Sequence, residues 1–184
     1  MWYSLLTFSR ISISLVFLAS AFGKLRDVSA FEQTIHKLQV LPGKAGRPVA
    51  YLLLAAELIT IPLLFGWPWP ATFGFGLAIG LLGLFSLVLW IAIRKGNPIS
   101  CGCFGPSQRP ISGFDIGRNM GLIFVALLGM ASHYMVSGAP MPPGIAEQIL
   151  TAMISITLTI LWINFGALAG FLEWANNAQS SSRT

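Results

Sequence analysis

The chain has 184 residues, of which only 9% are charged and 55% are hydrophobic, and its mean hydropathy is +0.75. A soluble domain usually carries about 25% charged residues, so the composition excludes a soluble enzyme, a nucleic-acid-binding domain and a disordered chain. The composition predicts a polytopic membrane protein, in which the net charge of +5 reports orientation in the bilayer before it reports an acidic partner.

Five apolar segments are long enough to cross a hydrocarbon core of about 30 Å, which takes about 20 residues of α-helix. They are residues 11–22, 49–66, 71–93, 120–136 and 145–172. The first starts as early as Leu5 if Arg10 extends toward the headgroups, and the last is long enough to continue beyond the bilayer. We therefore expect an all-α fold, with one bundle of about five transmembrane helices over residues 1–175 and a disordered tail at 176–184.

The first apolar segment ends on the small residues Ala19-Ser20-Ala21, which resemble the cleavage site of a signal peptide. Lys24 and Arg26 follow it directly, however, and positive charges in this position are typical of a helix that stops in the membrane. The sequence therefore predicts a retained helix with Lys24 and Arg26 at its flank.

Two local patterns predict packing around these spans. Phe31, Ile35 and Leu38 recur at helical spacing after Ser29, which predicts a short amphipathic helix at the membrane surface with Ser29 as its N-cap. Glycines at 74, 76, 80 and 83 in the third span predict a face of small residues against another helix.

The cationic residues predict the orientation of the bundle. Five of the eleven Lys and Arg residues lie in residues 24–48 and four in residues 94–118, whereas the other two connections contain none. The positive-inside rule assigns these two connections to the cytoplasm, which puts the N-terminus outside and the C-terminus inside.

Cys101 and Cys103 are the only cysteines, and they stand together in the run NPISCGCFGP between Asn97 and Pro106. A disulfide between them requires a turn, which Gly102 permits and the flanking prolines frame. A bridge that closes so small a ring is strained, and strain favours electron exchange with another thiol protein.

Three other interpretations of the cysteine pair stay open. In the first interpretation, the thiolates form half of a metal site, although zinc normally takes four ligands and no histidine lies nearby in the sequence. In the second, the two cysteines are small buried packing residues. In the third, they form a structural disulfide that takes part in no exchange reaction. Arg118 and Asp115 follow the pair; a nearby cation lowers a thiol pKa, but Arg118 equally marks the start of a helix.

Glu57 lies inside the second span, where an ionised carboxylate costs about 3 kcal/mol on insertion scales. It should therefore face the bundle interior. Two functions are conceivable for it, proton uptake coupled to thiol chemistry and hydrogen bonding to a ligand such as a quinone. Two structural roles are also open, a hydrogen bond between helices and an ion pair with Lys24 or Arg26. The sequence contains no motif that supports a quinone or another cofactor.

Taken together, four stretches resemble the MauE family of multi-span membrane proteins, which is related to the broader four-helix DoxX-like bundles. The resemblance rests on residues 22–27 (FGKLRD), residues 31–42, Glu57 and residues 101–105 (CGCFG), of which the last is the most specific. It covers most of the chain and implies a DoxX-like core of four helices with one helix added.

The resemblance implies a membrane accessory protein in the inner membrane of a bacterium, which serves methylamine utilisation. Family members are thought to assist processing, transport or disulfide maturation of the small subunit of methylamine dehydrogenase, beside a thioredoxin-like partner, MauD. Cys101 and Cys103 would form the redox pair, without a defined reaction, and Glu57 would be a secondary position.

Periplasmic disulfide maturation conflicts with the charge pattern, which puts the cysteines on the cytoplasmic side, where thiols are normally reduced. Either the connection exchanges electrons across the bundle or the charge rule fails here. Two other functions remain open: a non-catalytic scaffold that recruits the thioredoxin-like partner, and a small ligand-binding or transport bundle centred on Glu57.

Overall fold

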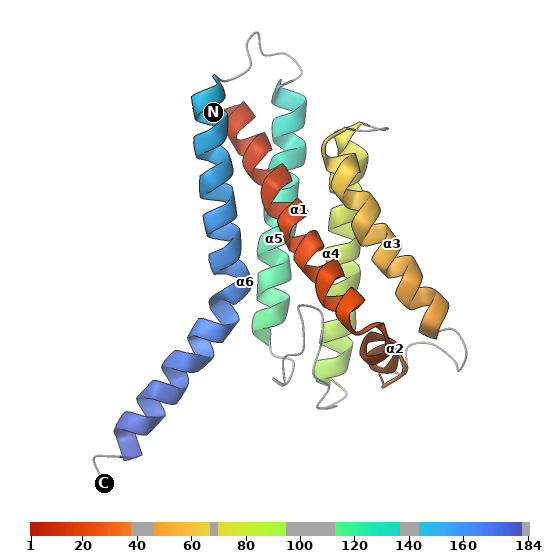
Figure 1. Ribbon diagram of the computed structural model, residues 1–184, viewed down its shortest axis with the longest axis vertical. Coiled ribbons are helices and arrows are strands. Elements are labelled where there is room, and N and C mark those ends of the chain that lie inside the picture. The colour runs from red at the N-terminus through yellow and green to blue at the C-terminus, as the bar shows by residue number, and fades with distance from the viewer. Residues whose placement is uncertain (38–45, 67–69, 95–112, 137–143, 182–184) are drawn as a thin grey trace.

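The computed structural model describes residues 1–37, 46–66, 70–94, 113–136 and 144–181, with the side chains of residues 30, 34–37 and 165–181 left aside (Figure 1). Over these ranges the chain is helical and contains no strand. The helices are α1 (Trp2–Arg26), α2 (Val28–Lys37), α3 (Gly46–Leu64), α4 (Ala71–Arg94), α5 (Gly113–Val136) and α6 (Ile145–Ser181).

Within the described ranges, five helices are long and apolar enough to cross a membrane. They are α1, α3, α4, α5 and the first 20 residues of α6, Ile145–Asn164, so the prediction of a polytopic helical membrane bundle is confirmed. The whole of α6 has 37 residues, about 55 Å at about 1.5 Å per residue. It therefore continues past the bilayer, and it is helical through residues 176–181 of the segment for which a disordered tail is predicted.

α1 is the central helix of the bundle and crosses it obliquely (Figure 1). It packs against α3, α5 and α6, while α4 packs against α3 and α5. Half of the apolar window of α1 is buried, against 11–33% of the windows in the other spans. The core accordingly combines apolar side chains of α1 with those of α4 and α5: Ile13, Val16, Phe17, Phe75, Ala78, Leu81, Leu82, Leu122 and Ala126.

α3 and α4 approach each other closely at a single glycine of the predicted small-residue face. A Cβ on Gly74 would lie 2.5 Å from Leu64 N and 2.9 Å from Leu63 O, which are backbone atoms of α3. Gly76, Gly80 and Gly83 would meet nothing within 4 Å. The prediction of a packing face is therefore wrong for these three positions. The spacing of glycines in a sequence does not tell whether they contact another helix or face the lipid.

α2 is the predicted short helix, and it lies at the end of the bundle where α1 finishes and α3 begins (Figure 1). It starts at Val28, so Ser29 falls in its first turn and not at the N-cap. The Ser29 hydroxyl donates to Asp27 Oδ1 at 2.8 Å, and the Asp27 carbonyl accepts from Phe31 N at 3.2 Å. Asp27 thus joins α1 to α2.

The helix ends agree with the topology that the charge pattern predicts. The C-terminal ends of α1 and α4 and the starts of α3 and α5 lie at the α2 end of the bundle (Figure 1). Both basic connections therefore begin and end on one side, and the N-terminus lies at the opposite end.

Candidate functional site

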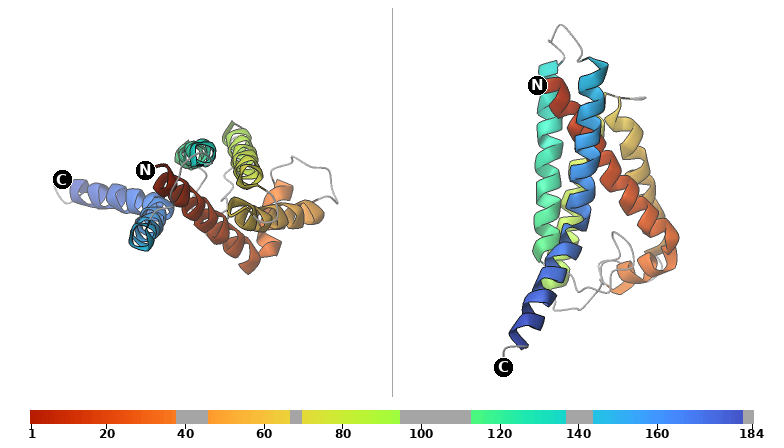
Figure 2. Two further views of the ribbon diagram at one scale, coloured as in Figure 1. Left: turned by 90° about the horizontal axis from the view of Figure 1, so that it is seen from above. Right: turned by 60° about the vertical axis from the view of Figure 1, so that its left-hand side comes forward.

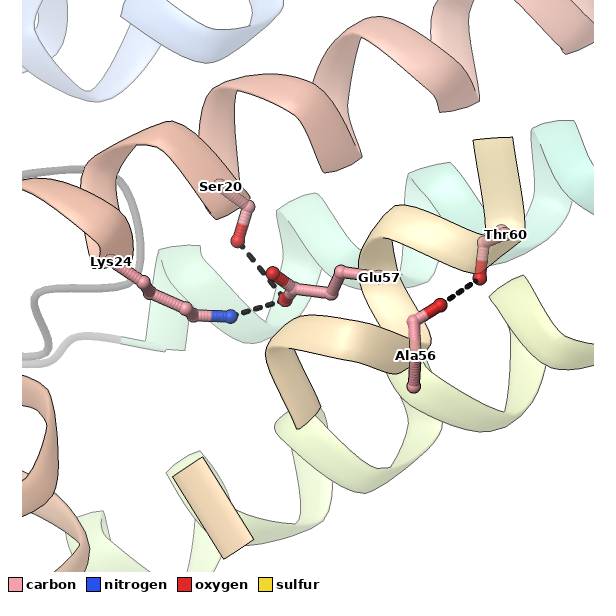
Figure 3. Close-up of polar contacts among 5 residues, drawn as sticks. All are labelled: Ser20, Lys24, Ala56, Glu57 and Thr60. Atoms are coloured by element: carbon pink, nitrogen blue, oxygen red, sulfur yellow. Dashed lines mark hydrogen bonds and ion pairs between the residues drawn. The ribbon is translucent and has the colours of Figure 1, made fainter. Parts of the chain in front are cut away.

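A buried ion pair joins α1 to α3. Lys24 Nζ donates to Glu57 Oε1 (Figure 3), and the two side chains are 1% and 0% exposed. The Ser20 hydroxyl donates to the same oxygen at 3.2 Å. Of the roles open for Glu57, the geometry supports the ion pair with Lys24, and the carboxylate faces the bundle interior as its cost in lipid requires.

The local sequence of α1 explains why these side chains meet. Ser20 and Lys24 are four residues apart, so they lie on one face of the helix, and both are buried there. The place of Lys24 after the apolar run predicts a flanking charge at the headgroups. In the structure, Lys24 is instead buried. It points inward to Glu57, which lies eleven residues into α3.

Two aromatic rings from other helices complete the surroundings of Lys24. Its Nζ lies 4.4 Å from the centroid of the Phe85 ring in α4 and 5.1 Å from that of Phe31 in α2. Both distances fall within about 6 Å, the range of a cation–π interaction. The ammonium group thus contacts side chains of α2, α3 and α4 from its own position near the end of α1.

The arrangement leaves one polar atom of the pair unsatisfied. Glu57 Oε2 is buried and has no hydrogen-bond partner in the described part of the chain. Thr60, one turn further along α3, does not serve it, because its hydroxyl donates to the Ala56 carbonyl at 2.7 Å (Figure 3). Among the described residues, no group of three or more His, Cys, Asp or Glu side chains is placed to hold a metal ion.

Arg26 and Arg118 lie apart from this cluster. Arg26 is exposed, with its guanidinium 5.5 Å from the ring of Phe22. Arg118 lies in the second turn of α5, where it is 12% exposed and 3.9 Å from Asp115 Oδ1. Arg118 is therefore largely buried within α5, five residues after the helix begins, and does not merely mark its start.

The predicted redox pair, Cys101 and Cys103, lies outside the described residues. The described ends of its connection are Arg94 in α4 and Gly113 in α5, both at the α2 end of the bundle (Figure 1). The structure thus brings Lys24 and Glu57 together and leaves the cysteine pair as a prediction from the sequence.

Sequence reasoning missed Ser20, Phe31 and Phe85 as members of the cluster. The spacing of Ser20 and Lys24 was a usable indication, because the two share a helix face. Phe31 was assigned to an apolar face, and its ring contacts Lys24 from there. Nothing in the sequence separates Phe85 from the other apolar residues of its span.

Comparison with known proteins shows the family to which this chain belongs. The family described as Methylamine utilisation protein MauE matches residues 3–132, which include all of α1 but its first residue, the whole of α2, α3 and α4, and most of α5. The chain belongs to the MauE family. Methylamine utilization protein MauE of Paracoccus denitrificans is 29% identical over 185 residues, covering 95% of this chain and 90% of that protein.

Methylamine utilization protein MauE of Paracoccus versutus is 31% identical over 161 residues, covering 86% of this chain and 83% of that protein. No solved structure matches the chain. The MauE match spans the entire Lys24–Glu57 cluster and the cysteine connection. The chain is thus a multi-pass membrane member of a family named for methylamine utilisation.

Proposed function

We propose that this MauE family member is an accessory protein of methylamine utilisation in the inner membrane of a bacterium. It assists processing, transport or disulfide maturation of the small subunit of methylamine dehydrogenase, beside a thioredoxin-like partner of the MauD type. The observation that carries the proposal is the family match over residues 3–132, which includes the only two cysteines of the chain, Cys101 and Cys103.

The chemistry proposed for the cysteines is thiol–disulfide exchange. A thiolate on one protein attacks a sulfur of a disulfide on the other and forms a mixed disulfide, which the second thiolate resolves. One disulfide becomes two thiols as two thiols become one disulfide, so the two electrons and two protons balance without a further reactant. The small ring that Cys101 and Cys103 would close favours such exchange because it is strained.

Lys24 and Glu57 have a positioning role in this proposal. They join α1 to α3, and Phe85 brings α4 to the same cluster. α4 ends at Arg94, where the cysteine connection begins. The cluster would therefore fix one attachment point of the connection, the end of α4.

The experiment replaces both cysteines, as Cys101→Ser/Cys103→Ser, in a bacterium that makes methylamine dehydrogenase. The measurement is the fraction of small subunit with free thiols, from the mass added by an alkylating reagent. We expect that fraction to rise several-fold, and the protein level in the membrane is followed by immunoblot. Ser100→Ala in the same connection is the matched control and should leave the small subunit oxidised.

A small subunit that remains fully disulfide-bonded in the double variant would refute thiol exchange. The same result would favour the non-catalytic scaffold, which tolerates the loss of the sulfur atoms but not of the surface that recruits the thioredoxin-like partner. A transport bundle centred on Glu57 has less support, because Lys24 and Ser20 already occupy one oxygen of this carboxylate.

A further inference from the structure

A groove lies on the side of the bundle away from the Lys24–Glu57 pair. The residues that line it come from α1, α5 and α6, and α5 and α6 each pack on α1 (Figures 1 and 2). A cavity of about 100 Å³ lies in the groove and is open on one side. It is lined by Ser12 of α1, Leu122 and Val125 of α5, and Leu158, Thr159 and Trp162 of α6.

The hydroxyl of Ser12 is an exception among the hydroxyls of the spans. Most of the others donate to the carbonyl four residues earlier, at 2.6–2.9 Å: Ser9, Thr60, Ser86, Ser132, Thr151, Ser155, Thr157 and Thr159. This bond satisfies a hydroxyl within a helix. Ser12 is 5% exposed, and its Oγ has no hydrogen-bond partner in the described part of the chain. Ser14 shares this property but does not line the cavity.

The residues that line the cavity determine which kind of ligand can bind in it. The walls are almost entirely apolar, and the Thr159 hydrogen already goes to the Ser155 carbonyl. Ser12 therefore offers a free O–H donor to an acceptor on an otherwise apolar molecule. The cavity, of about 100 Å³, is smaller than the apolar cavity of about 150 Å³ that binds benzene, but it is open on one side. A ring can therefore enter it only with its substituents projecting outward.

The side chain of Trp162 is held at the edge of this cavity by a glycine on the facing helix. A Cβ on Gly121 would lie 2.7 Å from Cζ2 of the indole, so the ring rests directly on the α5 backbone at this position. Trp162 also lines the cavity, and an aromatic side chain contacts a planar ring favourably either edge to face or in an offset stack. Leu158 and Trp162 are 48% and 45% exposed, which puts the open side on the lipid-facing surface of α6.

The depth of Ser12 decides where the acceptor comes from. Ser12 lies ten residues after the start of α1 and fourteen before its end, which is about 15 Å and 21 Å along the helix at about 1.5 Å per residue. Phospholipid ester carbonyls lie at the edges of a hydrocarbon core about 30 Å thick, so they do not reach this depth. The acceptor must belong to a molecule that dissolves in the core itself.

We propose that the groove binds the ring of a lipid-soluble quinone, which enters from the bilayer between α5 and α6. Ser12 Oγ donates to one ring carbonyl, Trp162 packs on the ring, and the isoprenoid or alkyl tail leaves through the open side. Binding alone is assigned to this site, and it does not depend on the chemistry of Cys101 and Cys103.

The test measures equilibrium binding of a tritium-labelled short-tail benzoquinone to the full chain in phosphatidylcholine nanodiscs, corrected with empty nanodiscs. Ser12→Ala should raise Kd about tenfold, the effect of losing one hydrogen bond. Val125→Phe should abolish saturable binding, because the larger side chain fills the cavity. Ser9→Ala removes a buried serine of the same helix whose hydroxyl is satisfied, and its Kd should stay within twofold of the parent value.

A photoreactive azido derivative of the same quinone should crosslink to peptides that contain residues 122–125 or 158–162. The proposal is overturned if binding is not saturable, which leaves the groove to water or acyl chains. It is equally overturned if Ser12→Ala binds as Ser9→Ala does, or if crosslinks map to other helices. Circular dichroism of each variant checks folding, and Ser12→Ala keeps the test decisive if Val125→Phe does not fold. The double cysteine variant should bind the quinone normally, so failure here is distinct from failure of the proposed function.

Discussion

Replacing Lys24 by methionine leaves the Glu57 carboxylate without its cation at a position where both side chains are inaccessible, at 1% and 0% exposure. Removing one partner of a buried ion pair costs about 3–5 kcal/mol, because the remaining charge is uncompensated. Ser20 Oγ, 3.2 Å from Oε1, still donates to the carboxylate but brings no positive charge. We therefore expect Lys24→Met to lower the free energy of unfolding by about 3–5 kcal/mol.

Glu57→Leu should cost less than Lys24→Met. The ammonium group of Lys24 keeps the rings of Phe85 and Phe31 at 4.4 and 5.1 Å, and a desolvated cation–π contact contributes up to about 2 kcal/mol. The double variant Lys24→Met/Glu57→Leu has no charge left at this site, and replacing a whole buried pair by apolar residues is often neutral or stabilising. Its stability should return to within about 1 kcal/mol of the parent, so the two changes are strongly non-additive.

The assay is unfolding by SDS in mixed micelles, followed by circular dichroism. Arg26→Met is the matched control, since Arg26 belongs to the same helix end but is exposed; it should change the stability by less than about 0.5 kcal/mol. If Lys24→Met is no more costly than Arg26→Met, or if the double variant loses the sum of the two single effects, Lys24 and Glu57 are not coupled as a buried ion pair.

Two further predictions concern helix packing and orientation. Gly74→Ala should lower the stability by about 1–3 kcal/mol, because its Cβ would meet α3 backbone atoms at 2.5–2.9 Å. Gly80→Ala, with nothing within 4 Å, should leave it unchanged or raise it by up to about 1 kcal/mol; equal effects in the same SDS titration would contradict the close approach. The charge pattern predicts that a membrane-impermeant maleimide reaches Cys101 and Cys103 only after lysis. Labelling in intact cells would overturn that orientation. Labelling only after lysis would exclude a simple periplasmic thiol donor, and thiol exchange by this pair would then have to pass electrons across the bundle.

The spans were predictable wherever the apolar run is unbroken. The predicted third span, 71–93, differs by one residue from α4, Ala71–Arg94. α5 begins at Gly113, whereas the predicted span begins near 120. The prediction starts late because the charged residues Asp115 and Arg118 interrupt the apolar pattern. In the structure these two lie one turn apart on the helix, 3.9 Å from each other, so the helix includes residues that hydropathy assigns to a connection.

The first span was predicted too short for a related reason. α1 begins at Trp2, but serines and Arg10 dilute its apolar pattern in the first half. Ser9 is nevertheless fully buried, with its hydroxyl satisfied by the Leu5 carbonyl at 2.9 Å. A helix in the centre of a bundle can carry such residues because its neighbours are protein and not lipid, which the sequence of one helix does not reveal.

The candidate site was predicted in its residues but not in its arrangement. Glu57 had to face the interior because of its cost in lipid, and Lys24 and Arg26 were equivalent partners for it in the sequence. The choice between them depends on the rotation of α1 about its axis. Lys24 lies four residues after the buried Ser20 and shares its face, whereas Arg26 is turned away by about 200° at about 100° per residue.

An ion pair at this position also selects how α1 and α3 assemble. Lipid is as apolar as the helix surfaces, so burial of apolar side chains alone favours no particular rotation of one span against another. An unpaired Lys24 or Glu57 is costly at depth in the membrane, and one combination of rotation and register brings the two together with Phe85 alongside. The pair therefore adds little net stability to the native arrangement, but it makes arrangements that leave either charge unpaired unfavourable. That penalty keeps the ends of α1, α3 and α4 in one geometry, and α4 ends at Arg94, where the sequence that carries Cys101 and Cys103 begins.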